Sequence, residues 1–426
     1  MQQLNYKGKT DKSKLDSSYL IVGIDIAKQK QYARITDFNG NELGKKIIFT
    51  RDIFGLKQLL MHIDTLKIKY KKTSVLVAME PTGIYWKNIY YGLKNLDNEI
   101  ETVLVDVKDV INVRKLFYET VKTDTVDSIA IAKTAILKGY KQRLELSEKE
   151  QNIKDIVSYR EKLIKESVSL KNGLIGILDE VFPEYSKFYS DYFCKSSLIL
   201  LDKIFCPKDI SNIDIEELYR DIKSKSKTCL SKNKLMKLKE LANASIGIEV
   251  SEGKKMQFEF NIGILKAILS EIDNTEKRIS ELLSEHEMVK KMIEIDGMNI
   301  VSAANIISEI GSFDKFNDYK QLISYCGFNL RIAESGARKG KTVISKRGNS
   351  RLRSYLFRVI LPMIKHNKEF SELHNYYKTR NNNPLKPMQS IIALICKLLR
   401  ILWGIAKRNT SYNPQLAFKK TFVTVA

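Results

Sequence analysis

The sequence of 426 residues has few of the side chains that bind transition metals or cross-link chains. It contains only four histidines and five cysteines, and no two cysteines form a Cys-x-x-Cys pair or stand near a set of histidines. This scarcity argues against a zinc site and favours reduced thiols in a cytoplasmic protein. The cysteines are Cys194, Cys206, Cys229, Cys326 and Cys396.

We also expect the sequence to lack a signal peptide and a membrane-spanning helix. Residues 1–18 are polar and rich in lysine, so we expect a flexible tail and no signal peptide. Residues 391–405 are apolar but include Lys397 and Arg400, as in an amphipathic or core helix. The sequence therefore predicts no membrane partner.

Acidic residues are the third shortage. Lys and Arg number 72 against 50 Asp and Glu, which gives a net charge of +22. So large a surplus repels itself unless a polyanion binds, and nucleic acid is the first candidate, before an anionic membrane surface. A hydrophobic fraction of 43% is ordinary for a folded chain of two or three domains.

The first part of the chain reads as a mixed sheet with helices. Strand patterns occur at 20–27, 31–37, 42–49, 75–79 and 102–105, and Asn39-Gly40 predicts a tight hairpin. Helical spacing follows at 56–63 and over 107–138. Three antiparallel strands followed by alternating helix and strand describe a ribonuclease H-like layout.

One carboxylate stands inside the first apolar strand. Strand alternation places Asp25 on the same face as Gly23 and Ala27, so we expect a bare surface beside it that a nucleic-acid backbone can approach. A charge in such a run is costly unless it is paired or holds a metal. A solvated Asp at the end of an edge strand is the alternative.

Three further acids are placed to join it. Glu80 ends the fourth strand, and Asp124 and Asp127 are three residues apart on one helix face. In a ribonuclease H-like sheet these positions are neighbours of Asp25, and four close carboxylates need cations. Oxygen ligands of this kind suit Mg²⁺ or Mn²⁺ and phosphodiester chemistry.

Long helices are expected from about residue 150. Apolar residues repeat every three or four positions over 153–177 and 265–283, with breaks at Arg160, Ser167 and Glu276. The pattern predicts a helical hairpin or a coiled-coil arm that pairs between chains, and a plain helical domain is the alternative. Residues 180–255 have no evident role.

The C-terminal part opens with a weak helix-hairpin-helix pattern. Gly297 supplies the first glycine of the hairpin, and Asn299 holds the place of the second. In this motif the hairpin and a helix N-terminus offer amide N–H groups to a phosphate.

A strongly basic stretch follows at 331–358, with nine Lys and Arg against the single acid Glu334. Ser335 stands there beside Gly336, a setting in which arginines lower a hydroxyl pKa and neutralise charge on phosphorus. A Ser-Gly turn in a phosphate-binding loop is the more economical explanation from these residues alone. The predicted nucleic-acid contacts are Arg331, Arg338, Lys339, Lys341, Lys346, Arg347, Arg351 and Arg353.

Short motifs at both ends of the chain carry a family resemblance. They are Gly-Ile-Asp-Ile-Ala-Lys at 23–28, Met-Glu-Pro-Thr-Gly-Ile-Tyr at 79–85, Lys-Thr-Asp-Thr-Val-Asp at 122–127, Ile-Asp-Gly at 295–297, Tyr-Cys-Gly-Phe at 325–328, Glu-Ser-Gly at 334–336, Ile-Ser-Lys-Arg-Gly-Asn at 344–349 and Leu-Arg at 352–353. In this order they resemble the DEDD-type insertion-sequence transposases of the IS-one-ten kind, the bridge-RNA-guided recombinases.

The resemblance implies a RuvC-like domain whose metal ligands are Asp25, Glu80, Asp124 and Asp127, and a transposase domain whose nucleophile is Ser335. It further implies a covalent phosphoserine, donor and target DNA, a structured guide RNA, and a homo-oligomer that is a dimer or, in synapsis, a tetramer. Asp106 departs from the usual Asn, and Asn299 from the usual Gly.

The expected fold class is α/β + α. The expected domains are a tail at 1–18, a ribonuclease H-like (RuvC-like) domain at 19–145, a helical or coiled-coil segment at 146–290, a mostly helical transposase domain at 291–410 and a tail at 411–426.

Three other functions are alternatives to a transposase. A RuvC-like hydrolytic nuclease or junction resolvase would leave Ser335 structural. An actin-like ATPase or sugar kinase predicts near-neutral charge and glycine-rich adenosine loops, which this chain lacks. A nucleic-acid-binding protein without catalysis explains the charge but leaves the four acids without a task.

Overall fold

The computed structural model describes residues 15–118, 123–140, 147–225, 231–331, 334–335, 338–339 and 343–422. The chain divides into two compact units. The first comprises Met1–Leu146, Asp314–Asn317 and Ser324–Arg351, and the second comprises Ser147–Phe313, Asp318–Ile323 and Leu352–Ala426.

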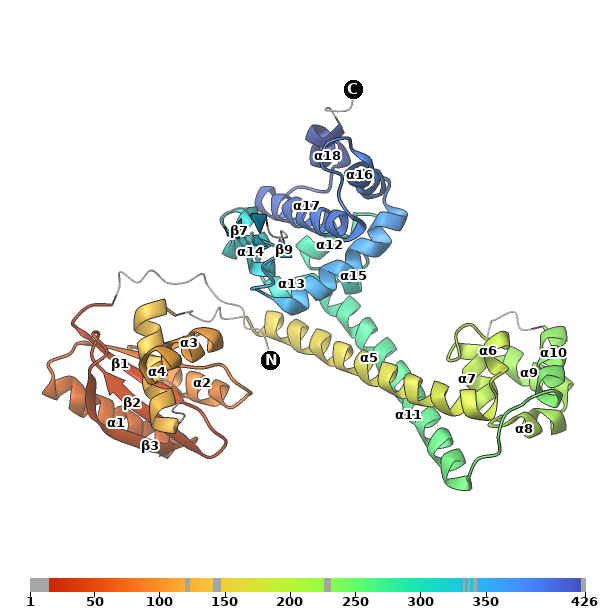
Figure 1. The fold of residues 1–426 in the computed structure, drawn as a ribbon, viewed down its shortest axis with the longest axis horizontal. Coiled ribbons are helices and arrows are strands. Elements are labelled where there is room, and N and C mark those ends of the chain that lie inside the picture. Colours follow the sequence, from red (N-terminus) through yellow and green to blue (C-terminus); the bar gives the residue numbers. More distant parts are fainter. Residues whose placement is uncertain are drawn as a thin grey trace. The chain divides into compact units, whose positions relative to one another are not determined.

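The first unit is built on a mixed sheet of five strands in the order β3-β2-β1-β4-β5 (Figure 1). β2 pairs antiparallel with β1 and β3, whereas β1, β4 and β5 run parallel. The five predicted strands and the Asn39-Gly40 hairpin are therefore confirmed, with small shifts at the ends. The strands are β1 (Tyr19–Asp25), β2 (Lys30–Thr36), β3 (Glu42–Thr50), β4 (Ser74–Met79) and β5 (Glu101–Leu104).

Helices cover both faces of this sheet. α1 (Ile53–Lys69) and α2 (Trp86–Leu96) share a core with Leu20, Val22 and Ile24 on one face. α3 (Val107–Tyr118) and α4 (Asp124–Lys138) pack on the other face. Strand alternation explains the division, because successive residues of β1 point to opposite faces.

The expectation of a bare surface beside Asp25 is wrong, because α4 fills it. A Cβ atom on Gly23 would lie 2.0 Å from the carbonyl oxygen of Ser128 and 2.7 Å from the amide nitrogen of Ala132. The glycine therefore admits the backbone of a helix of the same chain. Nucleic acid cannot occupy that place while the sheet and helix are packed.

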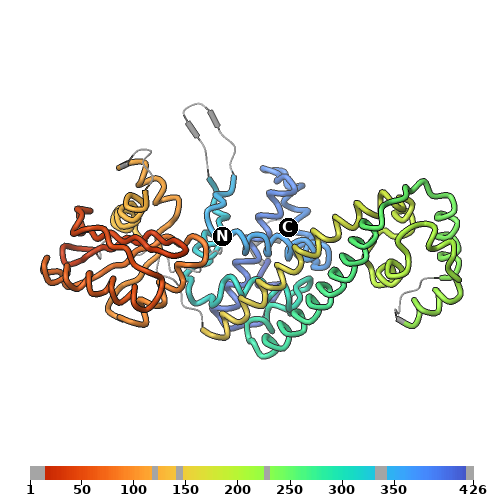
Figure 2. Tube along the Cα trace, turned by 90° about the horizontal axis from the view of Figure 1, so that it is seen from below, coloured from red at the N-terminus to blue at the C-terminus, as the bar shows by residue number. Residues whose placement is uncertain are grey.

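Two long helices, α5 (Glu148–Val181) and α11 (Glu252–Leu283), run side by side in the second unit (Figures 1 and 2). Two of the predicted breaks in their apolar repeats meet each other. The Arg160 guanidinium donates from Nε and Nη2 to Oε1 of Glu276, at 2.9 and 2.5 Å. The helical hairpin is thus formed within one chain.

In the described residues of the segment between the long helices, five short helices share a core of their own. That core collects apolar side chains from all of them and from the adjoining ends of α5 and α11. The Tyr185 hydroxyl is buried against the Ser197 hydroxyl at 2.6 Å. The helices are α6 (Tyr185–Phe188), α7 (Lys195–Leu201), α8 (Pro207–Asn212), α9 (Ile215–Lys225) and α10 (Lys232–Asn243).

The remaining elements are mostly helical. α17 is long and apolar enough to span a membrane by length and composition, and 50% of its apolar window is buried inside the protein. The elements are α12 (Glu287–Ile293), α13 (Ile300–Ile310), η2 (Phe313–Lys315), α14 (Tyr319–Cys326), β6 (Leu330–Arg331), β7 (Glu334–Ser335), β8 (Arg338–Lys339), β9 (Val343–Ile344), α15 (Ser350–His366), α16 (Lys368–Thr379), α17 (Pro387–Arg408) and α18 (Pro414–Phe422).

The contact at Gly23 predicts a stability effect. Gly23→Ala should destabilise the first unit by about 1–3 kcal/mol, because a methyl group there must displace helix backbone. Denaturant unfolding followed by circular dichroism measures it. Gly176→Ala in α5 is the matched control, since no atom lies within 4 Å of its Cβ position and alanine favours helix. Equal stability of Gly23→Ala and the wild type would contradict the packing.

Candidate active site

The ends of two parallel strands bring Asp25 and Glu80 together. Ile24 of β1 lies in register with Met79 of β4, so Asp25, the last residue of β1, is beside Glu80, which follows β4. Both side chains are half-buried. The carboxyl ends of parallel strands thus create an acidic edge of the sheet.

α4 contributes the other two acids through its first turn. Thr123 caps this helix, its hydroxyl accepting from the Val126 N–H at 3.3 Å, and Asp124 and Asp127 follow. α4 packs on β1 and β2, as the close approach at Gly23 requires. The Tyr32 hydroxyl, on the residue opposite Asp25 in β2, donates a hydrogen bond to Asp124.

Electrostatics link these carboxylates. Burial raises the pKa of Glu80 to about 7, and the negative charges of Asp25 and Asp127 add to the rise. Burial, the charge of Asp124 and its hydrogen bond likewise raise the pKa of Tyr32. Like charges at this edge therefore oppose one another, and a bound cation would relieve the repulsion.

A positive side chain already offsets part of that charge. Arg114 of α3 contacts Asp127, with 2.6 Å between Nη1 and Oδ1, and the Asp127 side chain is only 16% exposed. Asp106, the predicted departure from the family pattern, directly precedes α3 and accepts from the Lys108 N–H at 3.0 Å. Its charge also contributes to the raised pKa of Glu80.

The donor chemistry of this edge fits a hard divalent cation, because all four acids offer oxygen and Glu80 is held in a repulsive field. These acids do not yet form a complete set of metal ligands, because among the described residues no three His, Cys, Asp or Glu side chains are grouped closely enough to hold an ion. Arg114 already engages one of these carboxylates, that of Asp127.

Ser335 lies in a different part of the chain, at the end of a short strand. β7 pairs antiparallel with β8, and the backbone of Ser335 lies opposite Arg338. β6 and β9 pair in the same sense outside them. In chain order, the pair β7–β8 therefore lies between β6 and β9, and Ser335 is the last residue of β7.

The base of this hairpin is held by two of the motifs quoted in the sequence analysis. The amide of Asn349 donates to the carbonyl of Tyr325 at 2.8 Å, and that of Lys346 to the carbonyl of Gly327 at 3.0 Å. A Cβ on Gly348 would lie 2.4 Å from the Tyr325 carbonyl oxygen. The glycine thus permits a tight clasp between segments 325–329 and 344–349, which we call the hairpin clasp.

The predicted basic contacts fall into several groups. Arg331, Lys346 and Arg347 are exposed around the clasp, and Lys346 has a positive φ of 54°. Arg351 and Arg353 are half-buried on α15. Arg338 and Lys339 form β8, and Lys341 lies outside the described residues.

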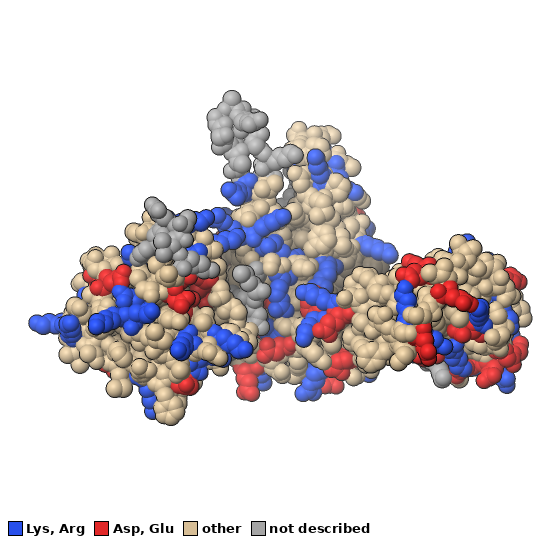
Figure 3. Space-filling model, turned by 60° about the horizontal axis from the view of Figure 1, so that its bottom comes forward, with Lys and Arg blue, Asp and Glu red and all other residues tan. Residues whose placement is uncertain are grey.

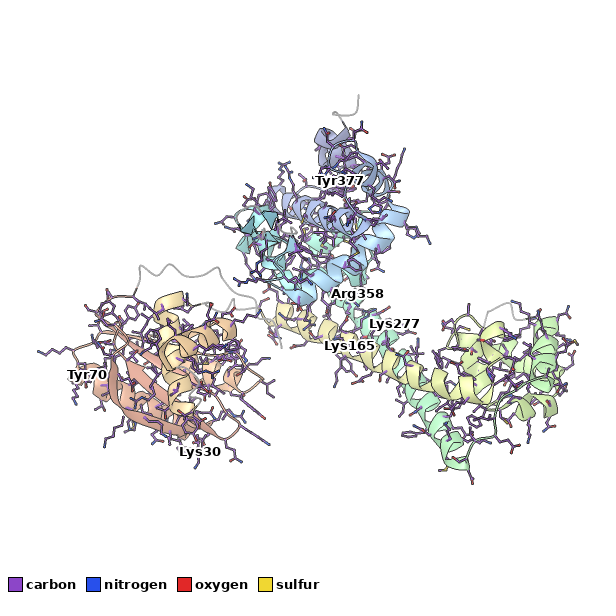
Figure 4. The ribbon with its side chains drawn as sticks, viewed as in Figure 1. Lys30, Tyr70, Lys165, Lys277, Arg358 and Tyr377 are labelled. Carbon is purple, nitrogen blue, oxygen red and sulfur yellow. The ribbon has the colours of Figure 1, made fainter. Side chains whose placement is uncertain are left out.

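Basic side chains are numerous on the face drawn in Figure 3, while acidic and basic groups mix over α6–α10. Not every cation of the basic stretch is available. Arg358 donates from Nη2 to both carboxylate oxygens of Glu161 on α5, at 3.1 and 3.0 Å, and Figure 4 labels it beside that helix.

The helix-hairpin-helix pattern has a local explanation. Asn299 caps α13, its side chain accepting from the Ser302 N–H at 2.8 Å. A Cβ on Gly297 would lie 2.8 Å from Cα of Met363 on α15. One amide that would bind phosphate is therefore already paired, and the glycine serves helix packing.

Sequence reasoning missed Tyr32 and Arg114. Tyr32 belongs to the alternating pattern of β2, but its position opposite Asp25 depends on a pairing register that no motif encodes. Arg114 is thirteen residues before Asp127 on another helix. Only the packing of α3 against α4 joins them.

Comparison with known proteins gives two family matches. Residues 22–183 match a family described as "Transposase", the DEDD type of IS110, and residues 289–375 match the "Transposase IS116/IS110/IS902 family". The chain is 21% identical over 402 residues to the "Transposase for insertion sequence element IS1111A" of Coxiella burnetii, covering 92% of this chain and 91% of that protein. It is 23% identical over 160 residues to a Pseudomonas aeruginosa protein named "Probable family 20 transposase", covering 35% and 47%.

The raised pKa of Glu80 predicts how stability depends on pH. The folded pKa of about 7 exceeds the ordinary value of 4.5, so this group's stabilising effect is complete below about pH 4.5 and is lost as pH rises through 7. Glu80→Gln should remove that decline. Thermal unfolding without metal from pH 4 to 8 measures it, with the exposed Glu99→Gln as control.

Adding Mg²⁺ tests the same edge. Above pH 7 it should raise the unfolding temperature of the wild type more than that of Glu80→Gln, because the ion binds the folded carboxylates. An identical pH profile for Glu80→Gln and the wild type would show that the repulsion at Glu80 is absent.

Proposed function

Because the chain belongs to the IS110 family of transposases, we propose that it cuts and rejoins DNA strands of an insertion sequence through Ser335. The observation that carries the proposal is the acidic edge, where Glu80, Asp25 and Asp127 share one field. The sheet order β3-β2-β1-β4-β5 supports a ribonuclease H-like, RuvC-like domain around it.

The carboxylates of Asp25, Glu80, Asp124 and Asp127 would hold Mg²⁺ or Mn²⁺, which when bound neutralises charge on a phosphodiester. This chain's own residues prepare the place. Tyr32 orients Asp124 by its hydrogen bond. Arg114 holds Asp127 in place and offsets its negative charge, which a bound cation would also neutralise.

Ser335 is the proposed nucleophile. Its Oγ–P bond forms as a P–O bond of the DNA strand breaks, and the hydroxyl proton passes to the solvent or a base while the leaving oxygen ends as a hydroxyl. The phosphoserine keeps the energy of the phosphodiester, so the strand can be rejoined without an external source. The pairing of Ser335 with Arg338 in the hairpin supports this role.

The partners follow from charge and chemistry. A net charge of +22 supports binding of more than one nucleic-acid strand, and we propose donor and target DNA with a structured guide RNA. More than 200 residues separate Asp127 from Ser335, so the active site is composite. A homo-oligomer, in which chains share such sites, agrees with this arrangement.

Covalent capture tests the nucleophile. Protein, RNA and end-labelled DNA are incubated with Mg²⁺, denatured and examined for protein-linked DNA. The wild type should give the adduct, and Ser335→Ala should give none, because no other hydroxyl takes its place. Ser354→Ala is the control, since Ser354 is exposed on α15 and lies outside the clasp. An adduct with Ser335→Ala would assign the nucleophile elsewhere, and free cut ends without an adduct in the wild type would favour hydrolysis.

Salt dependence tests the hairpin clasp. Arg331→Gln and Arg347→Gln should each lower the slope of log affinity against log salt by about 0.9 for duplex DNA, one phosphate contact each. Arg358→Gln is the matched control, because its guanidinium is engaged by Glu161 and its loss should cost stability without changing the slope. The measurement is fluorescence anisotropy at several salt concentrations. Unchanged slopes for both clasp variants would remove these arginines from the DNA contact.

A further inference from the structure

The acidic edge of the first unit has a basic neighbour along the same edge of the sheet. Lys30 is the first residue of β2 and pairs with Thr50, the last residue of β3. Arg51 follows Thr50 directly. Asp25 ends β1, two strands away from β3. Two strand spacings are about 10 Å, which a DNA strand covers within a few nucleotides.

A cation–π contact links the basic side to the acidic side. The Arg51 guanidinium lies over the Tyr85 ring, with 4.2 Å between Cζ and the ring centroid. Tyr85 is five residues after Glu80, on the turn that leads into α2. The neighbouring Trp86 is 1% exposed and anchors that turn in the core.

The cations here are not neutralised by the protein. Across the part of the chain that the structure describes, Arg51, Lys28 and Lys30 form no ion pair with a carboxylate. Asp52, the acid next to Arg51, is engaged instead by the Gly55 N–H at 2.8 Å, as the cap of α1. Arg34 differs, because Glu42 pairs with it.

Stacking prepares Arg51 for an anion. A guanidinium that lies over a ring keeps N–H donors at its edge, and its planar fork can bind a phosphate with two hydrogen bonds. There is room beside it. No atom lies within 4 Å of the Cβ position of Gly83, and Ile84 is 61% exposed on the same turn.

We propose that Arg51, held by Tyr85 and assisted by Lys30, binds a backbone phosphate of the single DNA strand presented to the carboxylates at this edge. The inference rests on the proposed function, since it names the ligand of the acidic edge. Arg51 and Lys30 contact the strand, and Tyr85 is a positioning residue that keeps the guanidinium in place. The fixed phosphate sets which phosphodiester reaches Asp25 and Glu80.

A chemical footprint tests the contact locally. The full chain carrying Ser335→Ala is acetylated in EDTA with and without a single-stranded DNA of about 20 nucleotides, longer than ordinary site sizes. Mass spectrometry then reports each lysine. Lys30, exposed at one end of the unit, should be protected several-fold, while Lys69, stacked on Tyr70 at the far end of α1, should react equally in both samples (Figure 4).

Variants separate contact from packing. Arg51→Gln should abolish most of the Lys30 protection and lower the salt slope for the single strand by about 0.7, whereas Lys69→Gln should change neither. Tyr85→Leu should weaken the protection of Lys30 and leave the salt slope unchanged. Tyr85→Phe should behave as the wild type, because the ring remains. All variants should unfold at the wild-type temperature.

The result that overturns the proposal is equal acetylation of Lys30 with and without DNA, or protection that survives Arg51→Gln. Protection by an RNA oligonucleotide and not by DNA would overturn the DNA assignment. No strand is cut in this experiment, so a failed covalent capture with an intact footprint would reject Ser335 as nucleophile and leave the strand contact standing.

Discussion

The close approach of α4 to β1 is the constraint on which the rest of the first unit depends. Without a side chain at Gly23, the backbone of α4 comes within contact distance of the strand. The first turn of α4, which carries Asp124 and Asp127, belongs to the helix that this contact holds on β1. A larger residue at position 23 would move the helix outward from the strand.

That packing creates an electrostatic problem that the protein solves in two ways. The surroundings disfavour a negative charge on Glu80, because burial and the neighbouring carboxylates raise its pKa. Arg114 offsets part of it from inside the fold. Along the same edge, Arg51 stays unneutralised by any described carboxylate and stacks on Tyr85. One edge of the sheet thus carries acidic side chains beside basic ones.

The segment around Ser335 is held by backbone contacts rather than by charge. The hairpin clasp joins 325–329 to 344–349 by main-chain hydrogen bonds, and Gly348 allows the two segments to touch. Both segments carry motifs of the family resemblance, but the sequence does not show that they contact each other. Their meeting explains why a glycine and an asparagine stand at 348 and 349, and it fixes the base from which the strand of Ser335 departs.

By itself the sequence determined the five strands, the hairpin at Asn39-Gly40, the two long helices and the identity of the acids, because apolar periodicity and turn residues act locally. It misassigned Gly23 as an opening for ligand, and it treated Arg160 and Glu276 as defects of two repeats although they pair with each other. Tertiary structure alone decided these points, as well as the Arg114–Asp127 and Arg51–Tyr85 contacts. The physical reason is that strand register and helix packing join residues with no fixed spacing in sequence, so their energies exist only once the chain has folded.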